Sequence, residues 1–378
     1  MLYNDFCGEK NSALGLGLMR LPVIDGKESQ IDVQKAEEMI AYAMEKGIRY
    51  YDTAWGYHGG TSESVCGEIL SKYPRETFFL TSKFPGYDNS NMPKAKEIFE
   101  KQLEKCCTDY FDFYLIHNVY EGNIDDYLDP KFGIIDYFVE QKKAGRIKHL
   151  GFSFHGAFPV LERFVEACGE HMEFAQLQLN YMDWHFQNCD EKYAYCEKKG
   201  LPLIVMEPMR GGKLANIPED MAAELKKMRP EASPAEWAFR FLQALPQVKL
   251  VLTGASNMEQ ISENIALWGE EKPLTEEEFN KLVELADIES AKIGVPCTKC
   301  NYCASHCPME LPISLLLEYY NEHKSNAAFL APMAVEALPE EKRPDKCIGC
   351  RSCEEVCPQQ IKISEVFAEF VQMPHMQE

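Results

Sequence analysis

Along the first 269 residues, short runs of apolar residues alternate with longer segments in which apolar positions recur every three or four residues. The short runs have the length of buried strands, and the longer segments have the period of amphipathic helices. Glycine or proline stands at most junctions between them, as at Gly47, Gly145 and Pro246. We predict strands at 13–19, 48–53, 77–82, 111–117, 147–153, 174–180, 202–207 and 248–253, and helices at 32–46, 62–71, 93–107, 136–144, 159–168, 191–199, 234–244 and 258–267.

Strands that alternate with helices indicate a parallel α/β sheet. Eight such units in roughly 250 residues is the size of a (β/α)8 barrel. A doubly wound sheet is the competing fold, and it would require the pattern G-x-G-x-x-G after the first strand. The nearest match has Gly15 and Gly17 but carries Arg20 in place of the third glycine. We therefore predict an α/β protein built on a (β/α)8 TIM barrel.

The sequence changes character after residue 269. Residues 273–292 predict one more helix, because Thr275 and Glu278 have the spacing of a capping box at its start. Further on, 311–323 predicts a short helix, and 325–344 predicts a long loop or a second helix. These elements lie outside the barrel pattern and indicate a second, smaller domain.

Two runs of cysteine near the C-terminus share the spacing C-x2-C-x2-C-x3-C-P. With no export signal in the sequence, this spacing indicates metal binding rather than disulfides. Four thiolates also suit zinc, but two complete runs with a trailing proline favour iron–sulfur clusters. The first run is Cys297, Cys300, Cys303 and Cys307, and the second is Cys347, Cys350, Cys353 and Cys357.

The segment 296–363 resembles bacterial ferredoxins that carry two [4Fe–4S] clusters. In such ferredoxins the fourth cysteine of each run ligates the cluster held by the other run. The resemblance therefore implies two crossed ligand sets, one of Cys297, Cys300, Cys303 and Cys357, the other of Cys347, Cys350, Cys353 and Cys307. It also implies a small α+β ferredoxin-like domain at 291–378, after a barrel domain at 1–290.

Charge and hydropathy exclude several classes of partner. The chain has 60 acidic and 39 basic residues and a formal net charge of −21. Nucleic acids and anionic membrane surfaces attract basic faces, so neither is an expected partner. No apolar run reaches the length of a membrane span, and residues 1–10 lack the apolar core of a signal peptide. We therefore expect a cytoplasmic protein.

Ionisable residues follow three successive barrel strands. Asp52 and Tyr57 come at and after the end of the second strand, Lys83 ends the third, and His117 ends the fourth. Taken singly, an aspartate at a strand end is often a helix cap, a lysine is often solvated, and a lone histidine is more often structural than catalytic. Active sites of such barrels lie at the C-terminal ends of the strands, however, and there the four side chains would surround one mouth.

These motifs resemble those of the aldo/keto reductases over residues 13–268. The C-terminal cysteine runs make the chain similar to the iron–sulfur-containing branch of that family. The resemblance implies that Asp52, Tyr57, Lys83 and His117 are catalytic. The motifs that carry it lie at 52–57, 62–67, 81–83, 111–117, 151–153 and 254–264.

The chemistry of carbonyl reduction accounts for these residue types. Hydride addition leaves negative charge on the carbonyl oxygen, which a proton donor must meet, and Tyr57 would be that acid. A free phenol has a pKa near 10, which a neighbouring Lys83 ammonium would lower. Asp52 would hold Lys83 charged and in place, and His117 would orient the carbonyl. A nicotinamide cofactor, NADP or NAD, would supply the hydride.

On the nicotinamide side, the resemblance implies that Ser153 and Gln176 hydrogen-bond the carboxamide. The asparagine that usually follows this serine is Phe154 here, and the aromatic residue that commonly stacks on the nicotinamide falls at Met206.

On the adenosine side, the resemblance gives a set of candidate contacts that follow the last barrel strand. Within this set, Glu263 and Asn264 would hydrogen-bond the adenine. The basic residues that clamp a 2′-phosphate in many members of the family fall near Gly254 and Gln260, which leaves NADP and NAD both open. Two arginines at strand ends are candidate contacts for the pyrophosphate or an anionic substrate, with a surface salt bridge as the alternative for each. The set is Gly254, Asn257, Gln260, Glu263 and Asn264, and the arginines are Arg20 and Arg210.

Two functions are therefore carried forward. In the first, the chain is an NAD(P)-dependent oxidoreductase for a small carbonyl or alcohol, with clusters that exchange electrons with a redox partner protein. In the alternative, the barrel has weak or no reductase activity and serves as a redox-sensing or docking module whose clusters exchange electrons with a partner. With either barrel function, a third possibility is that the clusters are purely structural. Hydride transfer moves two electrons and a cubane cluster moves one, so direct coupling would need an intermediary such as a flavin, for which the sequence shows no motif.

Overall fold

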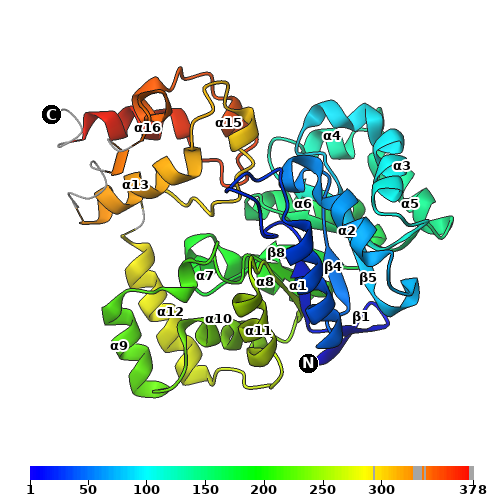
Figure 1. Cartoon of the computed structure of the whole chain (residues 1–378), viewed down its shortest axis with the longest axis horizontal. Helices are drawn as coiled ribbons and strands as arrows, with labels where there is room; N and C mark the ends of the chain where they lie inside the picture. The colour runs from blue at the N-terminus through cyan, green and yellow to red at the C-terminus, as the bar shows by residue number, and fades with distance from the viewer. Residues whose placement is uncertain (293, 327–333, 336–337, 374–378) are drawn as a thin grey trace. The chain divides into compact units, whose positions relative to one another are not determined.

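The structure is a computed structural model that describes residues 1–292, 294–326, 334–335 and 338–373 (Figure 1). The chain forms two compact units, Met1–Leu282 and Val283–Glu378. They divide inside helix α12 (Glu276–Ser290), whereas the boundary predicted from the sequence lies at the end of that helix. The exact boundary stays a prediction.

The first unit contains a closed barrel of eight parallel strands, as the alternating pattern predicts. Neighbouring strands follow the chain order, and β10 pairs with β3 to close the barrel. The strands are β3 (Leu14–Gly17), β4 (Tyr50–Asp52), β5 (Phe79–Phe84), β6 (Phe111–Val119), β7 (Ile147–Phe154), β8 (Ala175–Gln178), β9 (Leu203–Met206) and β10 (Val248–Thr253).

Helices connect successive strands (Figure 1). Those of ten residues or more bury an apolar stripe, and α10 buries seven of its ten residues. The α-helices of all lengths up to α11 are α1 (Val33–Glu45), α2 (Ser62–Leu70), α3 (Ala95–Lys105), α4 (Ile124–Leu128), α5 (Ile134–Lys143), α6 (Phe158–Cys168), α7 (Asp183–Phe186), α8 (Cys189–Lys199), α9 (Glu219–Met228), α10 (Pro234–Gln243) and α11 (Met258–Leu267).

A hairpin that the sequence pattern did not predict precedes the barrel. Strands β1 (Tyr3–Phe6) and β2 (Glu9–Ser12) pair around a two-residue turn in which Cys7 and Gly8 both have positive φ. The Phe6 ring is buried and stacks on Phe113 at 5.0 Å, within an apolar cluster that includes residues from five barrel strands. This hairpin therefore fills the end of the barrel at which the strands begin.

The opposite end of the barrel gathers the polar side chains. Asp52 ends β4, Lys83 lies next to the end of β5, and Ser153 lies next to the end of β7. Because all eight strands are parallel, their C-terminal ends meet at one mouth. The fold thus brings together residues that lie more than a hundred positions apart in the sequence.

The second unit has its own apolar core. Helix α13 (Ile313–Asn326) contributes Leu316, Leu317 and Tyr320, and α16 (Ile363–Gln372) contributes Phe367 and Phe370. A short helix, α15 (Ser352–Glu355), lies in the second cysteine run, and the described residues of this unit contain no strand. Within the segment 325–344, for which a long loop or a second helix is predicted, residues 327–333 and 336–337 lie outside the described residues.

The predicted capping box at the start of α12 is present. The Thr275 backbone N–H donates to Glu278 Oε2 at 2.8 Å, and the Glu278 N–H donates to Thr275 Oγ1 at 3.3 Å. Among the described helices, none is long and apolar enough to cross a membrane.

Candidate active site and cluster sites

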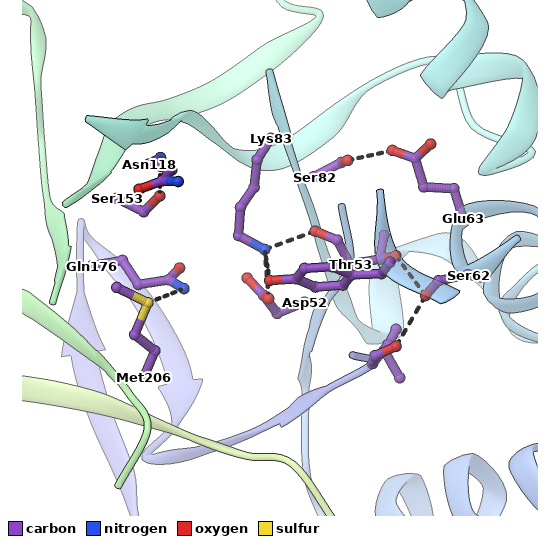
Figure 2. Close-up of polar contacts among 12 residues, drawn as sticks. Asp52, Thr53, Ser62, Glu63, Ser82, Lys83, Asn118, Ser153, Gln176 and Met206 are labelled. Carbon is purple, nitrogen blue, oxygen red and sulfur yellow. Dashed lines mark hydrogen bonds and ion pairs between the residues drawn. The ribbon is translucent and has the colours of Figure 1, made fainter. Parts of the chain in front are cut away.

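Lys83 is wholly buried at the mouth of the barrel, and its ammonium group joins three oxygen atoms (Figure 2). Its Nζ donates to Asp52 Oδ1 at 2.6 Å, to the Thr53 carbonyl at 2.8 Å and to Tyr57 Oη at 3.2 Å. The structure thus brings together three of the four residues that the resemblance makes catalytic. The positive charge lies next to the oxygen that would give up a proton.

The charges of the Asp52–Lys83 pair oppose the effects of burial. Burial raises the pKa of Asp52, and the Lys83 ammonium counters that rise. Burial lowers the pKa of Lys83, and the Asp52 carboxylate counters that fall. The 2.6 Å contact and the further bond from Lys83 to the Thr53 carbonyl favour the ionised pair, while Asp52 Oδ2 is buried without a hydrogen-bond partner among the described residues.

Tyr57 begins a short 3₁₀ helix directly after the second barrel strand. The next residue, His58, has a left-handed backbone with φ 54°. Its Nε2 accepts the Leu21 N–H at 3.1 Å, so its Nδ1 carries the proton and donates to the Glu28 carbonyl at 2.8 Å. These two bonds tie the loop that carries Tyr57 to the loop after β3.

His117 lies on β6 and is 2 % exposed. The Tyr57 and His117 rings meet edge to face with centroids 6.3 Å apart. Burial and the nearby Lys83 charge hold the pKa of His117 well below its usual value of 6.5. The imidazole is therefore neutral at pH 7, which suits a group that orients a carbonyl oxygen by hydrogen bonding.

We expect the barrel to lose thermal stability as the pH falls from about 7.5 to about 5.5, in part through His117. Below pH 6.5 the unfolded histidine takes up a proton that the buried one does not, so the unfolded state gains stability. One proton taken up only by the unfolded state lowers the free energy of unfolding by up to about 1.4 kcal/mol for each unit by which the pH falls. Circular dichroism melts across this range should show a flatter pH dependence for His117→Gln. The partly exposed His171→Gln serves as the control, and equal slopes for wild type and His117→Gln would contradict the assignment.

A second layer of buried hydrogen bonds supports the strand that carries Lys83. Ser82 Oγ and Gln102 Nε2 both donate to Glu63 Oε1, at 2.6 and 2.7 Å. Gln102 Nε2 also lies 3.0 Å from the Lys83 carbonyl, and Tyr114 Oη donates to Gln102 Oε1 at 2.6 Å. Sequence analysis missed Gln102, whose one signal is a polar residue on the apolar face of α3.

On the predicted nicotinamide side, Ser153 and Gln176 are register partners on β7 and β8 (Figure 2). Both are buried, and Gln176 Nε2 lies 3.7 Å from Met206 Sδ. Gln176 Oε1 is buried and has no hydrogen-bond partner in the described chain. A buried acceptor of this kind fits the amide group of a nicotinamide. Phe154 follows Ser153 and is buried, with Lys192 Nζ 5.8 Å from its ring centroid.

The two arginines proposed for anion contacts differ in setting. Arg20 is partly exposed and lies 3.3 Å from Glu207 Oε1. Arg210 is buried, and its Nε donates to Asp183 Oδ1 at 3.0 Å, so its salt bridge is internal rather than at the surface. Its Nη2 is buried without a hydrogen-bond partner among the described residues. Contact of either arginine with a bound anion stays a prediction.

The adenosine-side residues lie in the loop after β10 and in the first two turns of helix α11. Asn257 caps α11 by accepting the Gln260 N–H at 2.9 Å, and Gln260 Oε1 accepts the Ser256 N–H at 2.8 Å. Asn264 Nδ2 donates to Thr253 Oγ1 at 2.7 Å. Gly254 and Glu263 are exposed along the same stretch. Their position leaves the helix N-terminus open to a phosphate.

The cysteines line two cavities in the second unit. Each cavity combines three cysteines of one run with the last cysteine of the other run, which is the crossed arrangement that the resemblance implies. The first is lined by Cys297, Cys300, Cys303 and Cys357, and the second by Cys307, Cys347, Cys350 and Cys353.

The donor set fits an iron–sulfur cluster in each cavity. Each cavity is lined by four cysteines, the ligand number of a [4Fe–4S] cluster, and the C-x2-C-x2-C-x3-C-P spacing of both runs favours such a cluster over zinc. Burial raises the pKa of Cys303 and of Cys353 to about 12, so a metal must displace their protons. The Leu311 N–H lies 3.4 Å from Cys307 Sγ, as backbone amides do around cluster sulfurs.

Two family models match the chain. The aldo/keto reductase family model matches residues 13–287, and the 4Fe-4S dicluster domain model matches residues 296–362. The first covers the barrel and the second covers both cysteine runs.

Single proteins similar to the chain match the barrel. The "Uncharacterized oxidoreductase YqkF" of Bacillus subtilis is 28% identical over 301 residues, which cover 72% of this chain and 91% of that protein. The "NADH-specific methylglyoxal reductase" of Escherichia coli is 24% identical over 220 residues, covering 54% of this chain and 65% of that protein. The structure of the aldo-keto reductase AKR11C1 from Bacillus halodurans in its holo form has a TM-score of 0.61 and 25% identity, covering 75% and 96% of the two chains.

Proposed function

The chain belongs to the aldo/keto reductase family and carries an iron–sulfur domain, and we propose that it is an NAD(P)-dependent oxidoreductase acting on a small carbonyl or alcohol. Its two cysteine-lined cavities hold [4Fe–4S] clusters that pass single electrons to or from a partner protein. The observation that carries the proposal is the buried Lys83 ammonium, which joins the Asp52 carboxylate and the Tyr57 hydroxyl.

In the proposed reduction, Tyr57 gives its hydroxyl proton to the substrate oxygen as negative charge develops there. Lys83 stabilises the negative charge left on the Tyr57 oxygen, because its Nζ lies 3.2 Å away. Asp52 fixes Lys83 in position and balances its charge. Neutral His117 orients the carbonyl, and the buried setting of these residues strengthens each electrostatic contact.

The nicotinamide, when bound, supplies the hydride. We assign its carboxamide to Ser153 and Gln176, and the adenosine phosphates to the N-terminus of α11 with Asn257 and Gln260. The unpartnered Gln176 oxygen supports the first assignment. The open helix terminus supports the second, because backbone N–H groups there attract phosphate.

We expect NADH and NADPH to bind with affinities that differ by less than about a hundredfold. Gly254 and Gln260 provide no cation for a 2′-phosphate, and charge-assisted contacts are what make such a preference large. Isothermal titration of the anaerobically purified full chain with NADH, NADPH and FMN measures this directly. A larger preference for NADPH would assign the phosphate to another cation, such as Lys213 or Arg210. Binding of FMN in place of either nucleotide would contradict the proposed function.

We assign contact with the redox partner to the cluster in the second cavity, which Cys307, Cys347, Cys350 and Cys353 line. Cys350 is exposed, and Ile348 and Met309 on the same cavity are 63% and 37% exposed. Three cysteines of the first cavity are buried by comparison. A short path from cluster to surface favours single-electron exchange with another protein at this second cavity.

The alternative, a barrel that serves as a docking or redox-sensing module, is favoured by one observation. Met206 and Phe154 occupy positions where the family usually has an aromatic residue and an asparagine. Binding of neither nucleotide in the titration would favour this alternative, because a docking module has no need of a nucleotide. Where a nucleotide binds, hydride transfer to a carbonyl decides between the two functions.

A further inference from the structure

Asn118 follows the proposed catalytic histidine on β6 and is fully buried. Its backbone is left-handed, with φ 55°, at a register irregularity between Ile116 and Val119. Its N–H donates to Ser153 Oγ at 2.7 Å, and its carbonyl accepts from Asn123 Nδ2 at 2.8 Å. The backbone of Asn118 is thus held firmly against the serine assigned to the nicotinamide side.

The side chain of Asn118, in contrast, has no hydrogen-bond partner among the described residues. Both Oδ1 and Nδ2 are buried, and neither is bonded. Figure 2 shows this amide beside Ser153, on the same side of the site as Gln176, whose Oε1 is also buried and unpartnered. Buried amide atoms are nearly always hydrogen-bonded, so the unpartnered Asn118 amide and the unpartnered Gln176 Oε1 in one site indicate a polar ligand.

The unpartnered side-chain atoms of Asn118 and Gln176 are complementary in hydrogen bonding to one chemical group. Asn118 offers one acceptor and an N–H donor, and Gln176 offers a further acceptor. A primary carboxamide presents the complement, with one carbonyl oxygen and two N–H donors. The left-handed φ does not account for the residue by itself, because glycine would adopt that conformation without burying an unpartnered amide.

We propose that the Asn118 side chain binds the carboxamide of the nicotinamide, together with Gln176, and so replaces the asparagine that the chain lacks at Phe154. The Phe154 side chain cannot hydrogen-bond, and its ring lies near Lys192. Asn118 reaches the same ligand from the neighbouring strand β6. This inference rests on the proposed function and adds a residue that the family resemblance does not assign.

The test compares three probes on the anaerobically purified full chain by isothermal titration. NADH carries the carboxamide, its 3-acetylpyridine analogue replaces the amide nitrogen with a methyl group, and ADP-ribose lacks the ring altogether. The variant is Asn118→Gly, which keeps the left-handed backbone and removes the amide. Asn188→Gly is the matched control, because Asn188 is also left-handed, with φ 51°, but is exposed.

We expect wild type to bind NADH about ten- to hundredfold more tightly than the acetyl analogue, because the analogue leaves buried polar groups unmet. Asn118→Gly should lose most of the difference in affinity between NADH and the acetyl analogue, and it should keep its affinity for ADP-ribose. Asn188→Gly should match wild type with all three probes. If Asn118→Gly does not fold, Asn118→Asp keeps the size of the side chain, removes the N–H donor, and should likewise lose the discrimination.

The outcomes distinguish failure of the role assigned to Asn118 from failure of the proposed function. Unchanged discrimination in Asn118→Gly or Asn118→Asp, with NADH still bound, would overturn the role of Asn118 alone. Failure of wild type to bind either NADH or ADP-ribose would overturn the proposed function as well. Equal loss of NADH and ADP-ribose in Asn118→Gly would assign the residue a structural role instead.

Discussion

Replacing Tyr57 by phenylalanine is expected to lower the rate of carbonyl reduction by about 10²-fold or more. The change keeps the ring and removes the hydroxyl that lies 3.2 Å from Lys83 Nζ. A positioned general acid contributes about 10²–10⁴-fold to such a reaction, and no other described side chain is assigned that role here. Single-turnover rates of nucleotide oxidation with a small aldehyde measure the effect, and nucleotide affinity should be nearly unchanged.

Tyr51→Phe provides the matched control for this experiment. Tyr51 is buried on β4, the strand that precedes Tyr57, and its hydroxyl donates to the Ile48 carbonyl at 3.3 Å. This variant should keep the wild-type rate. Wild-type turnover by Tyr57→Phe would remove Tyr57 from the role of acid and leave the Asp52–Lys83 pair as a structural feature.

The second large effect concerns the crossed ligation of the clusters, which pairs of alanine substitutions can reveal. If Cys297 and Cys357 ligate the same cluster, replacing both should remove about four of the about eight iron atoms per chain. That is the iron content of one [4Fe–4S] cluster. Replacing Cys297 and Cys307 should then remove iron from both cavities. Iron analysis of the anaerobically reconstituted full chain, with the electron paramagnetic resonance of the reduced protein, gives the counts.

Uncrossed runs predict the opposite pattern. The Cys297→Ala, Cys307→Ala protein would then keep one cluster, and the Cys297→Ala, Cys357→Ala protein would keep none. Cys168→Ala is the control, because Cys168 is buried in the barrel and lies outside both runs. The barrel should melt normally in every variant, since it forms a compact unit of its own.

The hydrophobic pattern predicted the barrel well because parallel strands buried on both faces appear as continuous apolar runs. It missed the β1–β2 hairpin, in which Phe6 is the one buried apolar side chain and the turn depends on Cys7 adopting a backbone that few residues favour. Helix α9 was missed because its buried positions are only Met221 and Leu225, too few to establish a period. Fold class thus follows from periodicity, while elements with little burial do not.

The candidate site was predictable where strand ends alone bring side chains together, as for Asp52 and Lys83. Asn118 was not, because strict alternation along β6 places it on the face opposite His117. The irregularity between Ile116 and Val119 changes that placement, and no sequence pattern encodes it. Gln102 was missed for a different reason, since its partners come from α2 and two strands and meet only in the fold.

Hydride transfer from nicotinamide to a carbonyl is the central claim, and isotope transfer tests it most directly. The full chain would be incubated without oxygen with NADH and NADPH deuterated at C4, and with a panel of small aldehydes and ketones that includes methylglyoxal. We predict deuterium from one face of the nicotinamide ring at the carbinol carbon of an alcohol product, and none with Tyr57→Phe on the same timescale. Nucleotide that binds but delivers no deuterium to any carbonyl in the panel would contradict the account and favour the docking module.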